Sequence, residues 1–220
     1  PADPNKFSFD KEVSAIFEDM ARRSIPNFEA AHEAHAEMVR AKFAHPCKVL
    51  DIGASRGSFL KAIKHTATRH GLSLEHLQYT AMDTSQEMCD YISNDYPEAR
   101  VVLGDATDEA AYREVNGLYD IVCLHYVLQF IKPEDQIRTL LKVFSLVKPG
   151  GFLIFGHKSS HIGYTGELAH DQYIEFRIRN GYTREEVEAK TRALKGSMFP
   201  RDHYILLNTL RHHFSEVQET

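Results

Sequence analysis

The stretch VLDIGASRGSFL, residues 49–60, decides the fold. It joins a short apolar run to Asp51 and then to two glycines, Gly53 and Gly57, which stand four residues apart. A glycine turn between a buried strand and a helix lets the backbone approach a ligand and directs the first N–H groups of the helix toward it. The stretch therefore predicts a ligand site at the carboxyl end of a strand.

The same stretch discriminates between ligand classes. No third glycine completes the G-x-G-x-x-G pattern of dinucleotide sites, and no Gly-Lys-Ser/Thr follows as in a P-loop. Asp51 precedes the loop, where it would repel a pyrophosphate but attract a ligand that carries ammonium and sulfonium charges. A cationic sulfonium nucleoside is thus favoured over a dinucleotide or a triphosphate.

The middle of the chain alternates apolar runs with helical segments. Each run is rich in β-branched and aromatic residues, as in a strand that is buried on both faces. The predicted strands are 48–52, 77–83, 99–105, 119–126 and 151–157, and the predicted helices between them are 57–70, 85–94, 108–115 and 133–146. This alternation predicts an α/β fold with a doubly wound, mostly parallel sheet.

The flanking segments extend this core within a single domain. Two helices, from residue 10 to before Pro26 and over 27–43, form an N-terminal helical cap over 1–45, followed by the core over 46–157. Residues 158–202 predict a helical insertion that acts as a lid or as a homodimer contact. Residues 203–220 predict a last helix and the start of a further strand, FSEVQ, so we expect the natural chain to continue beyond Thr220.

Composition excludes several classes of protein. With 43% hydrophobic and 26% charged residues and a net charge of −5, the chain has no general basic surface for nucleic acid. No apolar run approaches the roughly 18 residues that span a membrane. The three cysteines lack C-x-x-C spacing, which indicates reduced thiols in the cytoplasm, and the 13 histidines form no H-E-x-x-H motif, so no metal site is expected.

Three acids end three consecutive predicted strands. They are Asp51, Asp83 and Asp105, and in a parallel sheet they lie at one edge, where ligands of open α/β sheets bind. Each acid alone could instead cap a helix or hold a loop. Their recurrence at three strand ends favours a shared ligand.

Four further motifs follow in order: AMDTS (81–85), LGDAT (103–107), YDIVCLHYVLQF (119–130) and LVKPGGFLIF (146–155). Over about residues 45–157 the chain resembles the class I S-adenosylmethionine-dependent methyltransferases, which have a Rossmann-like fold. The resemblance implies that Asp83 binds the ribose hydroxyls and Asp105 the adenine amine. The full set of cofactor-binding residues that it implies is Phe28, Asp51, Gly53, Ala54, Ser55, Gly57, Asp83, Thr84, Asp105, Ala106 and His125.

Other segments are similar to one subgroup, the carboxy-S-adenosylmethionine synthases. They are FDKEVSAIFEDMARRSIPNF (9–28), LHYVLQFIKPED (124–135), GEL (166–168) and RNGYT (179–183). The resemblance implies that prephenate donates a carboxyl group to the cofactor, and that the product serves a separate transferase that modifies the tRNA wobble uridine. Such a synthase need not touch RNA.

Three positions depart from that subgroup. Phe28 and His125 stand where the subgroup has a tyrosine and an asparagine, and Thr191 stands where an arginine grips the new carboxylate. A threonine hydroxyl cannot replace a bidentate guanidinium. We therefore favour methyl transfer to a small-molecule acceptor. Carboxy-S-adenosylmethionine synthesis with prephenate is the alternative, and a non-catalytic subunit that binds the cofactor or a partner is a second one.

The candidate catalytic residues follow the fourth and fifth strands. An unperturbed histidine has a pKa near 6.5, so His125 is a candidate general base at neutral pH, or it bonds the cofactor's carboxylate. Tyr126 adjoins it, and His157 is the second base candidate. Residues of the insertion could close over an acceptor or lie on helix surfaces. They are Tyr164, His170 and Tyr173, together with Arg177, Arg179 and Arg192, which could receive an anion or pair with glutamates.

Overall fold

A five-stranded parallel sheet forms the centre of the molecule, in the order β3-β2-β1-β4-β5. The computed structural model describes residues 11–160 and 164–219, with side chains from 16 to 160 and from 166 to 219. The strands are β1 (Cys47–Ile52), β2 (Leu77–Asp83), β3 (Arg100–Leu103), β4 (Tyr119–His125) and β5 (Val147–Gly156). The predicted α/β class and doubly wound sheet are confirmed.

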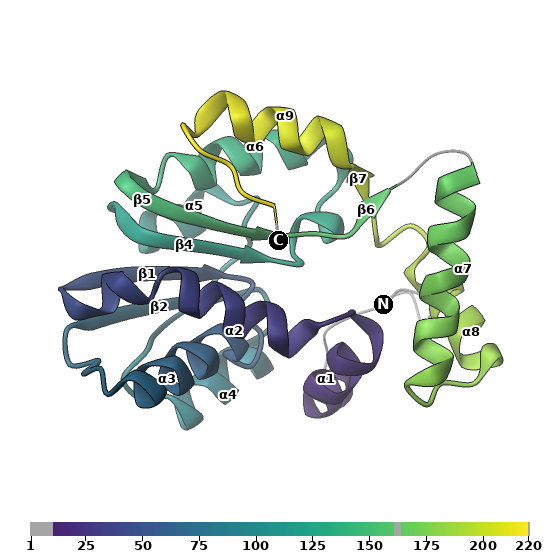
Figure 1. Ribbon diagram of the computed structural model, residues 1–220, viewed down its shortest axis with the longest axis horizontal. Helices are drawn as coiled ribbons and strands as arrows, with labels where there is room; N and C mark the ends of the chain where they lie inside the picture. Colours follow the sequence, from purple (N-terminus) through teal and green to yellow (C-terminus); the bar gives the residue numbers. More distant parts are fainter. Residues whose placement is uncertain (1–10, 161–163, 220) are drawn as a thin grey trace.

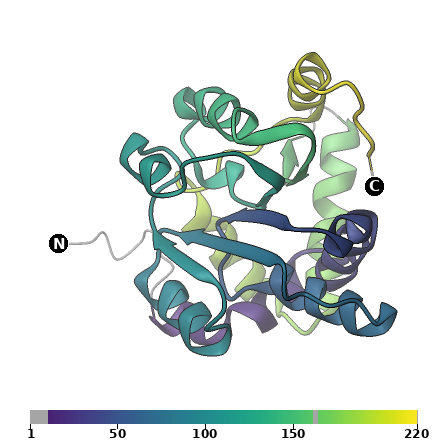
Figure 2. The ribbon, with the colours of Figure 1, turned by 90° about the vertical axis from the view of Figure 1, so that its left-hand side faces the viewer.

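Helices cover both faces of the sheet (Figure 2). They are α3 (Ser58–His70), α4 (Gln86–Asp95), α5 (Glu109–Glu114) and α6 (Pro133–Phe144). Buried side chains of α5, α6 and the C-terminal helix α9 (His203–His213) pack on one face, and those of α3 and α4 on the other. Side-chain caps begin two of these helices, because Ser85 accepts from the Met88 N–H and Asp108 from the Ala110 N–H.

Strand order reverses between β1 and β4, which both start in the middle of the sheet and lead to helices on opposite faces. Asp51 of β1 is in register with Cys123 of β4 and with Ala81 of β2. The loops that leave β1 and β4 therefore diverge and open a crevice at the carboxyl end of the sheet.

Two N-terminal helices precede the sheet, α1 (Lys11–Ser24) and α2 (Phe28–Met38). Residue 10, where the first helix was expected to begin, lies outside the described residues. The second helix was predicted to reach residue 43, but it ends at Met38 and the chain continues as a 3₁₀ turn, η1 (Arg40–Ala44). That turn buries Phe43 beneath α3, which a straight continuation of the helix would not achieve.

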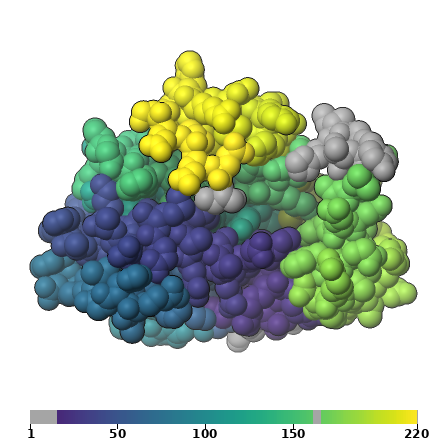
Figure 3. All heavy atoms as spheres, viewed as in Figure 1, coloured from purple at the N-terminus to yellow at the C-terminus, as the bar shows by residue number. Residues whose placement is uncertain are grey.

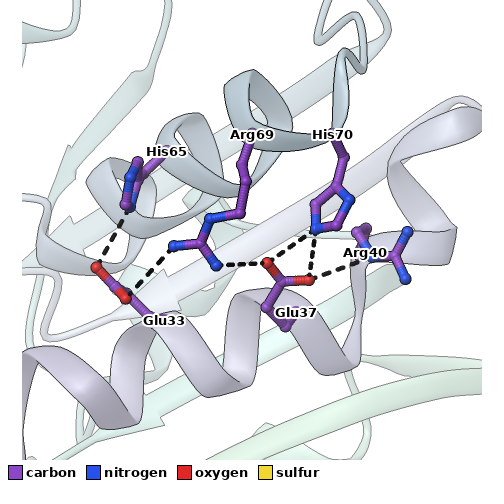
Figure 4. A network of polar contacts seen from close by, with 6 residues as sticks. All are labelled: Glu33, Glu37, Arg40, His65, Arg69 and His70. Carbon is purple, nitrogen blue, oxygen red and sulfur yellow. Dashed lines mark hydrogen bonds and ion pairs between the residues drawn. The ribbon is translucent and has the colours of Figure 1, made fainter.

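A polar network joins α2 to α3 on the surface (Figure 4). Glu37 contacts Arg69 at 3.1 Å, His70 at 3.0 Å and Arg40 at 3.2 Å, while Glu33 contacts His65 at 3.3 Å. Exposed pairs of this kind contribute about 0–1 kcal/mol each, so the network stabilises the contact between α2 and α3 only modestly.

The segment after β5 contains α7 (Tyr164–Arg179) and α8 (Arg184–Leu194), which lie with α1 at the carboxyl end of the strands (Figure 1). Two short strands, β6 (Ser159–Ser160) and β7 (Arg201–Asp202), pair in parallel at its base. The expectation of a purely helical insertion missed them, because two residues carry no strand pattern. Among the described residues, no helix is both long and apolar enough to cross a membrane.

The expected further strand after α9 is wrong for the described residues, which form no strand over 214–219. Phe214 instead packs edge-on against Phe144 of α6, with ring centroids 5.2 Å apart. The apolar side chain that suggested a strand thus contributes to the contact between α9 and the face of the sheet.

Candidate active site

A cavity of about 790 Å³ opens at the carboxyl ends of the strands, between the sheet and the helices α1, α7 and α8. Its size suits a nucleoside cofactor together with a second small molecule. All but one of the residues predicted to bind the cofactor or to act in catalysis outside the insertion line it: Phe28, Asp51, Gly53, Ala54, Ser55, Asp83, Thr84, Asp105, Ala106, His125, Tyr126 and His157.

Gly57 is the exception. It adopts φ +78° before α3, and a Cβ atom there would lie 2.9 Å from the ring of Tyr96. Its missing side chain therefore serves the packing of α3 against Tyr96, and Gly57 is not among the residues that line the cavity. The sequence could not separate this packing role from a ligand role, because both need a glycine at the same turn.

Asp51 is 3% exposed and accepts a hydrogen bond from the Tyr79 hydroxyl at 2.6 Å. Burial raises its pKa to about 6. No lysine or arginine among the described residues pairs with Asp51, and none pairs with Asp83. A buried carboxylate that faces a cavity without a counter-cation fits a cationic ligand.

Replacing Asp51 with asparagine is expected to remove a pH dependence of stability. Unfolding restores a carboxyl pKa near 3.9. The folded chain therefore holds this proton up to about pH 6 while the unfolded chain releases it, so the free energy of unfolding falls as pH rises through that window. Denaturant titrations from pH 4 to pH 7 should show that D51N lacks this fall.

The control is Asp120→Asn. The Lys48 N–H and the Lys148 ammonium bond Asp120 and hold its pKa below the usual value, so its contribution has the opposite sign and is lost as pH falls. Parallel stability curves for the wild type and D51N would contradict the assignment.

Asp83 organises the loop that follows β1. Its two oxygens accept the Ser55 N–H at 2.8 Å and the Ser85 N–H at 3.0 Å. Ser55 adopts φ +51°, unusual for a residue with a side chain, and this conformation is what turns its N–H toward Asp83. Each carboxylate oxygen keeps a second lone pair, so Asp83 can still accept the two hydroxyls of a ribose.

Asp105 lies two residues beyond the end of β3 and is exposed. One of its oxygens accepts both the Thr107 N–H at 2.7 Å and the Thr107 hydroxyl at 2.8 Å. The other oxygen has no hydrogen-bond partner among the described residues, and Asp105 lines the same cavity as Asp83. The turn thus holds Asp105 in place and leaves one acceptor for a ligand.

His125 is buried within a line of titratable side chains. Its Nδ1 lies 2.9 Å from the Cys123 sulfur and its Nε2 lies 2.9 Å from His35 Nδ1, and His32 packs against its ring at 4.5 Å. Burial lowers its pKa well below 6.5, so the imidazole is neutral. Because both ring nitrogens are engaged, a role as general base or as a ligand of the cofactor requires one of these contacts to break.

Tyr126 and His157 are placed differently. Tyr126 adopts φ +57°, which is strained for an aromatic residue, and its N–H donates to Gly156 O at 2.6 Å. The His157 Nδ1 is buried and has no hydrogen-bond partner of good geometry among the described residues, although the Lys158 backbone lies close enough to the ring to favour its protonated form. Burial also lowers the pKa of His157. A neutral imidazole with an unused nitrogen can accept a proton.

The insertion contributes only some of its predicted residues. Tyr173 lines the cavity, whereas His170, Arg179 and Arg192 are exposed and outside its lining, and Arg192 lies 3.8 Å from Glu188. The Tyr164 side chain lies outside the described residues. Arg177 is buried.

Four side chains near the site were missed by the sequence reasoning: His32, His35, Lys158 and Lys190. The two histidines stand at i and i+3 in a predicted helix, and that spacing could have placed them on one face. The two lysines carried no signal, because a lone lysine usually lies on a solvated surface.

The Thr191 hydroxyl already donates a hydrogen bond within the protein. It donates to Val187 O in its own helix at 2.8 Å. Phe28 of α2 is the other helical position that differs from the synthase subgroup. It is buried, and its ring centroid lies 6.1 Å from that of Tyr126. Both positions are therefore filled by uncharged groups, a buried ring on α2 and the hydroxyl of an exposed threonine bonded within α8.

Comparison with known proteins defines the class first. The family model described as "Methyltransferase domain" matches residues 50–153. Among solved structures, the plantazolicin methyltransferase BpumL, solved with a triazolic desmethylPZN analog and SAH, gives a TM-score of 0.58 at 15% identity, covering 92% of this chain and 69% of BpumL. A SAM-dependent methyltransferase from Archaeoglobus fulgidus gives 0.55 at 16% identity, covering 92% and 73%. The fold is that of the class I methyltransferases.

Curated relatives then narrow the class. The carboxy-S-adenosyl-L-methionine synthase of Aliivibrio salmonicida is 33% identical over 201 residues, which are 88% of this chain and 79% of the relative. The enzyme of the same name from Aeromonas hydrophila is 30% identical, covering 87% and 76%. The chain belongs to the carboxy-S-adenosyl-L-methionine synthase family. It is an S-adenosylmethionine-dependent transferase, and S-adenosylmethionine is its cofactor.

Proposed function

We propose that the chain transfers the methyl group of S-adenosylmethionine to a small-molecule acceptor. The observation that carries this proposal is Thr191, whose hydroxyl is bonded within its own helix where the resemblance expects a guanidinium for a carboxylated cofactor. Arg192, the adjacent arginine, is exposed and pairs with Glu188. Neither side chain supports the carboxyl chemistry of the relatives.

When bound, the cofactor supplies an electrophilic methyl group on a sulfonium, and transfer depends on positioning plus removal of a proton from the acceptor. The cofactor-binding set proposed here is the strand-end acids with the loop 53–55, Thr84, Ala106 and Phe28. His157 is our candidate base, because its Nδ1 is unused by the described residues and it lines the cavity. His125 and Tyr126 are proposed to position the reactants.

Carboxy-S-adenosylmethionine synthesis is the second candidate. It is favoured by the names of the curated relatives. In that reaction a C–H bond of the cofactor's methyl group would be replaced by a C–C bond to the carboxyl group that prephenate loses, while the prephenate ring aromatises by loss of its hydroxyl and the methyl proton and that hydroxide leave as water. The cavity would then have to receive the carboxylates of prephenate as well as the cofactor.

Mass spectrometry of the ligand released from the purified full-length protein tests the proposal. We expect S-adenosylmethionine or S-adenosylhomocysteine. Incubation with S-adenosylmethionine and a small-molecule cell extract should yield S-adenosylhomocysteine together with a product heavier by one CH₂ group. A His157→Gln variant should bind the cofactor normally and lose most of this turnover, because it lacks the basic nitrogen.

Two results would contradict methyl transfer. A carboxymethyl sulfonium, either co-purified or formed from prephenate, would establish the second candidate. Tight cofactor binding without either product would support the non-catalytic subunit instead. The matched control is His170→Gln, an exposed histidine of α7 outside the cavity lining, which should leave turnover unchanged.

Two further parts of the proposal concern the cellular compartment and the oligomeric state. The three cysteines are buried and free, which supports a reducing compartment such as the cytoplasm. A homodimer through residues 158–202 is supported by Leu168 of α7, whose side chain is 42% exposed. Small molecules are the proposed substrates, and nucleic acid is not.

A further inference from the structure

Arg177 of α7 is buried without satisfying its charge. The residue is 2% exposed, and its Nε and Nη2 have no hydrogen-bond partner among the described residues. A buried guanidinium normally forms several hydrogen bonds to a carboxylate or to carbonyl groups, because leaving it unpaired is costly. The fold therefore holds a cation in place and leaves two of its donor atoms unused.

Two lysines share the surroundings of Arg177. The Lys158 ammonium lies 4.5 Å from the centroid of the Tyr173 ring, and the Arg177 guanidinium carbon lies 5.7 Å from the same ring. On the other side, Arg177 lies 4.7 Å and Lys190 5.8 Å from the Tyr182 ring. We call Arg177, Lys158 and Lys190 the cationic triad.

No carboxylate of the described residues forms an ion pair with any member of the triad. Burial lowers the pKa of Lys158 and lowers that of Lys190 to about 8, and the charge of Arg177 acts in the same direction on both. Three like charges held together without a counter-ion destabilise each other. The chain thus concentrates positive charge here without neutralising it.

Arg23 of α1 shows what a structural arginine looks like in the same neighbourhood. Its guanidinium also lies over Tyr182, at 4.1 Å, but it donates to Asn180 O at 2.8 Å and to Gly181 O at 2.7 Å and pairs with Asp19 at 3.3 Å. These bonds tie α1 to the end of α7, and the space-filling view shows these segments in contact (Figure 3). The interhelical tie is made by Arg23, which leaves Arg177 without that role.

The triad adjoins the cavity that holds the strand-end acids. Lys158, Tyr173 and Lys190 all line it, together with Asp51 and Asp83, whereas Arg177 is not among the lining residues and lies 5.7 Å from the Tyr173 ring. One end of the cavity is therefore acidic and the other end cationic. A cationic cofactor fits the first end, and a partner of opposite charge fits the second.

We propose that the cationic triad binds the oxyanion group, a carboxylate or a phosphate, of the small molecule that reacts with the cofactor. The two lysines line the cavity and supply charge to the anion there, while Arg177, buried beside Tyr173 and outside the lining, adds its charge and holds two unused donors in the same cluster. That this small molecule reacts with the cofactor rests on the proposed function. That the triad binds an anion does not. The anion site serves an anionic methyl acceptor and an anionic carboxyl donor alike.

Thermal unfolding of the full chain saturated with S-adenosylhomocysteine tests the proposal, with malonate and inorganic phosphate as separate probes. We expect at least one probe to raise Tm saturably, and Arg177→Met to weaken its apparent affinity at least about 10-fold. Without any probe, R177M should raise Tm by about 2–4 °C or more, because it removes an uncompensated buried charge. A merely structural arginine would give a lower Tm.

The comparison of probes identifies the anion, since malonate reports a carboxylate site and phosphate a phosphate site. Lys190→Met should weaken binding in the same direction, whereas Arg179→Gln, an exposed arginine on the same helix, should bind as the wild type does. The proposal is overturned if neither probe acts beyond sodium chloride of equal ionic strength, or if R177M and the wild type respond alike. If the anion site fails in this way but R177M binds the cofactor as tightly as the wild type does, the proposed function is not contradicted.

Discussion

Replacing Gly53 with alanine is expected to lower the free energy of unfolding by about 3 kcal/mol, and Tm by roughly 10 °C. Gly53 adopts φ +71°, and a Cβ atom there would lie 2.1 Å from Val127 Cγ2. The loop cannot move aside easily, because the N–H groups of Gly53 and Ala54 both donate to Met82 O, at 2.7 and 3.1 Å. Any shift of this backbone also disturbs the proposed cofactor site, so cofactor affinity should fall as well.

Gly71→Ala is the matched control for backbone strain. Gly71 has a similar φ of +62°, but nothing lies within 4 Å of its would-be Cβ. G71A should therefore cost only about 1 kcal/mol and leave cofactor binding intact. In a G53A/V127A double variant, part of the loss should return because the collision is removed. Equal destabilisation in G53A and G71A, measured by denaturant titration, would show that the contact with Val127 is unimportant.

The sheet could be predicted because its signals are local. Strands buried on both faces read as continuous apolar runs, and the caps Ser85 and Asp108 stand directly before their helices. Elements set by tertiary contacts could not be predicted in this way. The second helix ends at Met38 because the following turn buries Phe43, and the apolar residues after α9 pack on α6 rather than pairing with β5.

The acidic and the cationic residues of the cavity also differ in how well the sequence could predict them. Asp51, Asp83 and Asp105 could be predicted to meet, since parallel strands bring their carboxyl ends to one edge. The cationic triad could not, because Lys158, Arg177 and Lys190 come from a loop and two helices whose docking no periodicity specifies. The sequence placed Arg177 among the candidate residues, but its burial and unused donors follow only from the packing of α7.

Replacing Asp83 with alanine is expected to weaken the binding of S-adenosylhomocysteine at least about 100-fold. We assign to each carboxylate oxygen one hydrogen bond with a ribose hydroxyl. A hydrogen bond to a charged group contributes about 1.5–3 kcal/mol, so losing two gives this minimum. Isothermal titration measures the affinity. Asp83 also holds the N–H groups of Ser55 and Ser85, so part of the loss reflects a loosened loop.

Two comparisons separate the direct contact from the loosened loop. The wild type should discriminate strongly against a ligand that lacks ribose hydroxyls, 2′,3′-dideoxyadenosine compared with adenosine, and D83A should lose this discrimination, because the group that reads the hydroxyls is gone. Asp202→Ala also removes a carboxylate that accepts two backbone N–H groups, those of Tyr204 and Ile205, but outside the cavity lining. D202A should lose stability and keep cofactor affinity. If D83A still discriminates between the two nucleosides, Asp83 orders the loop and does not bind the ribose.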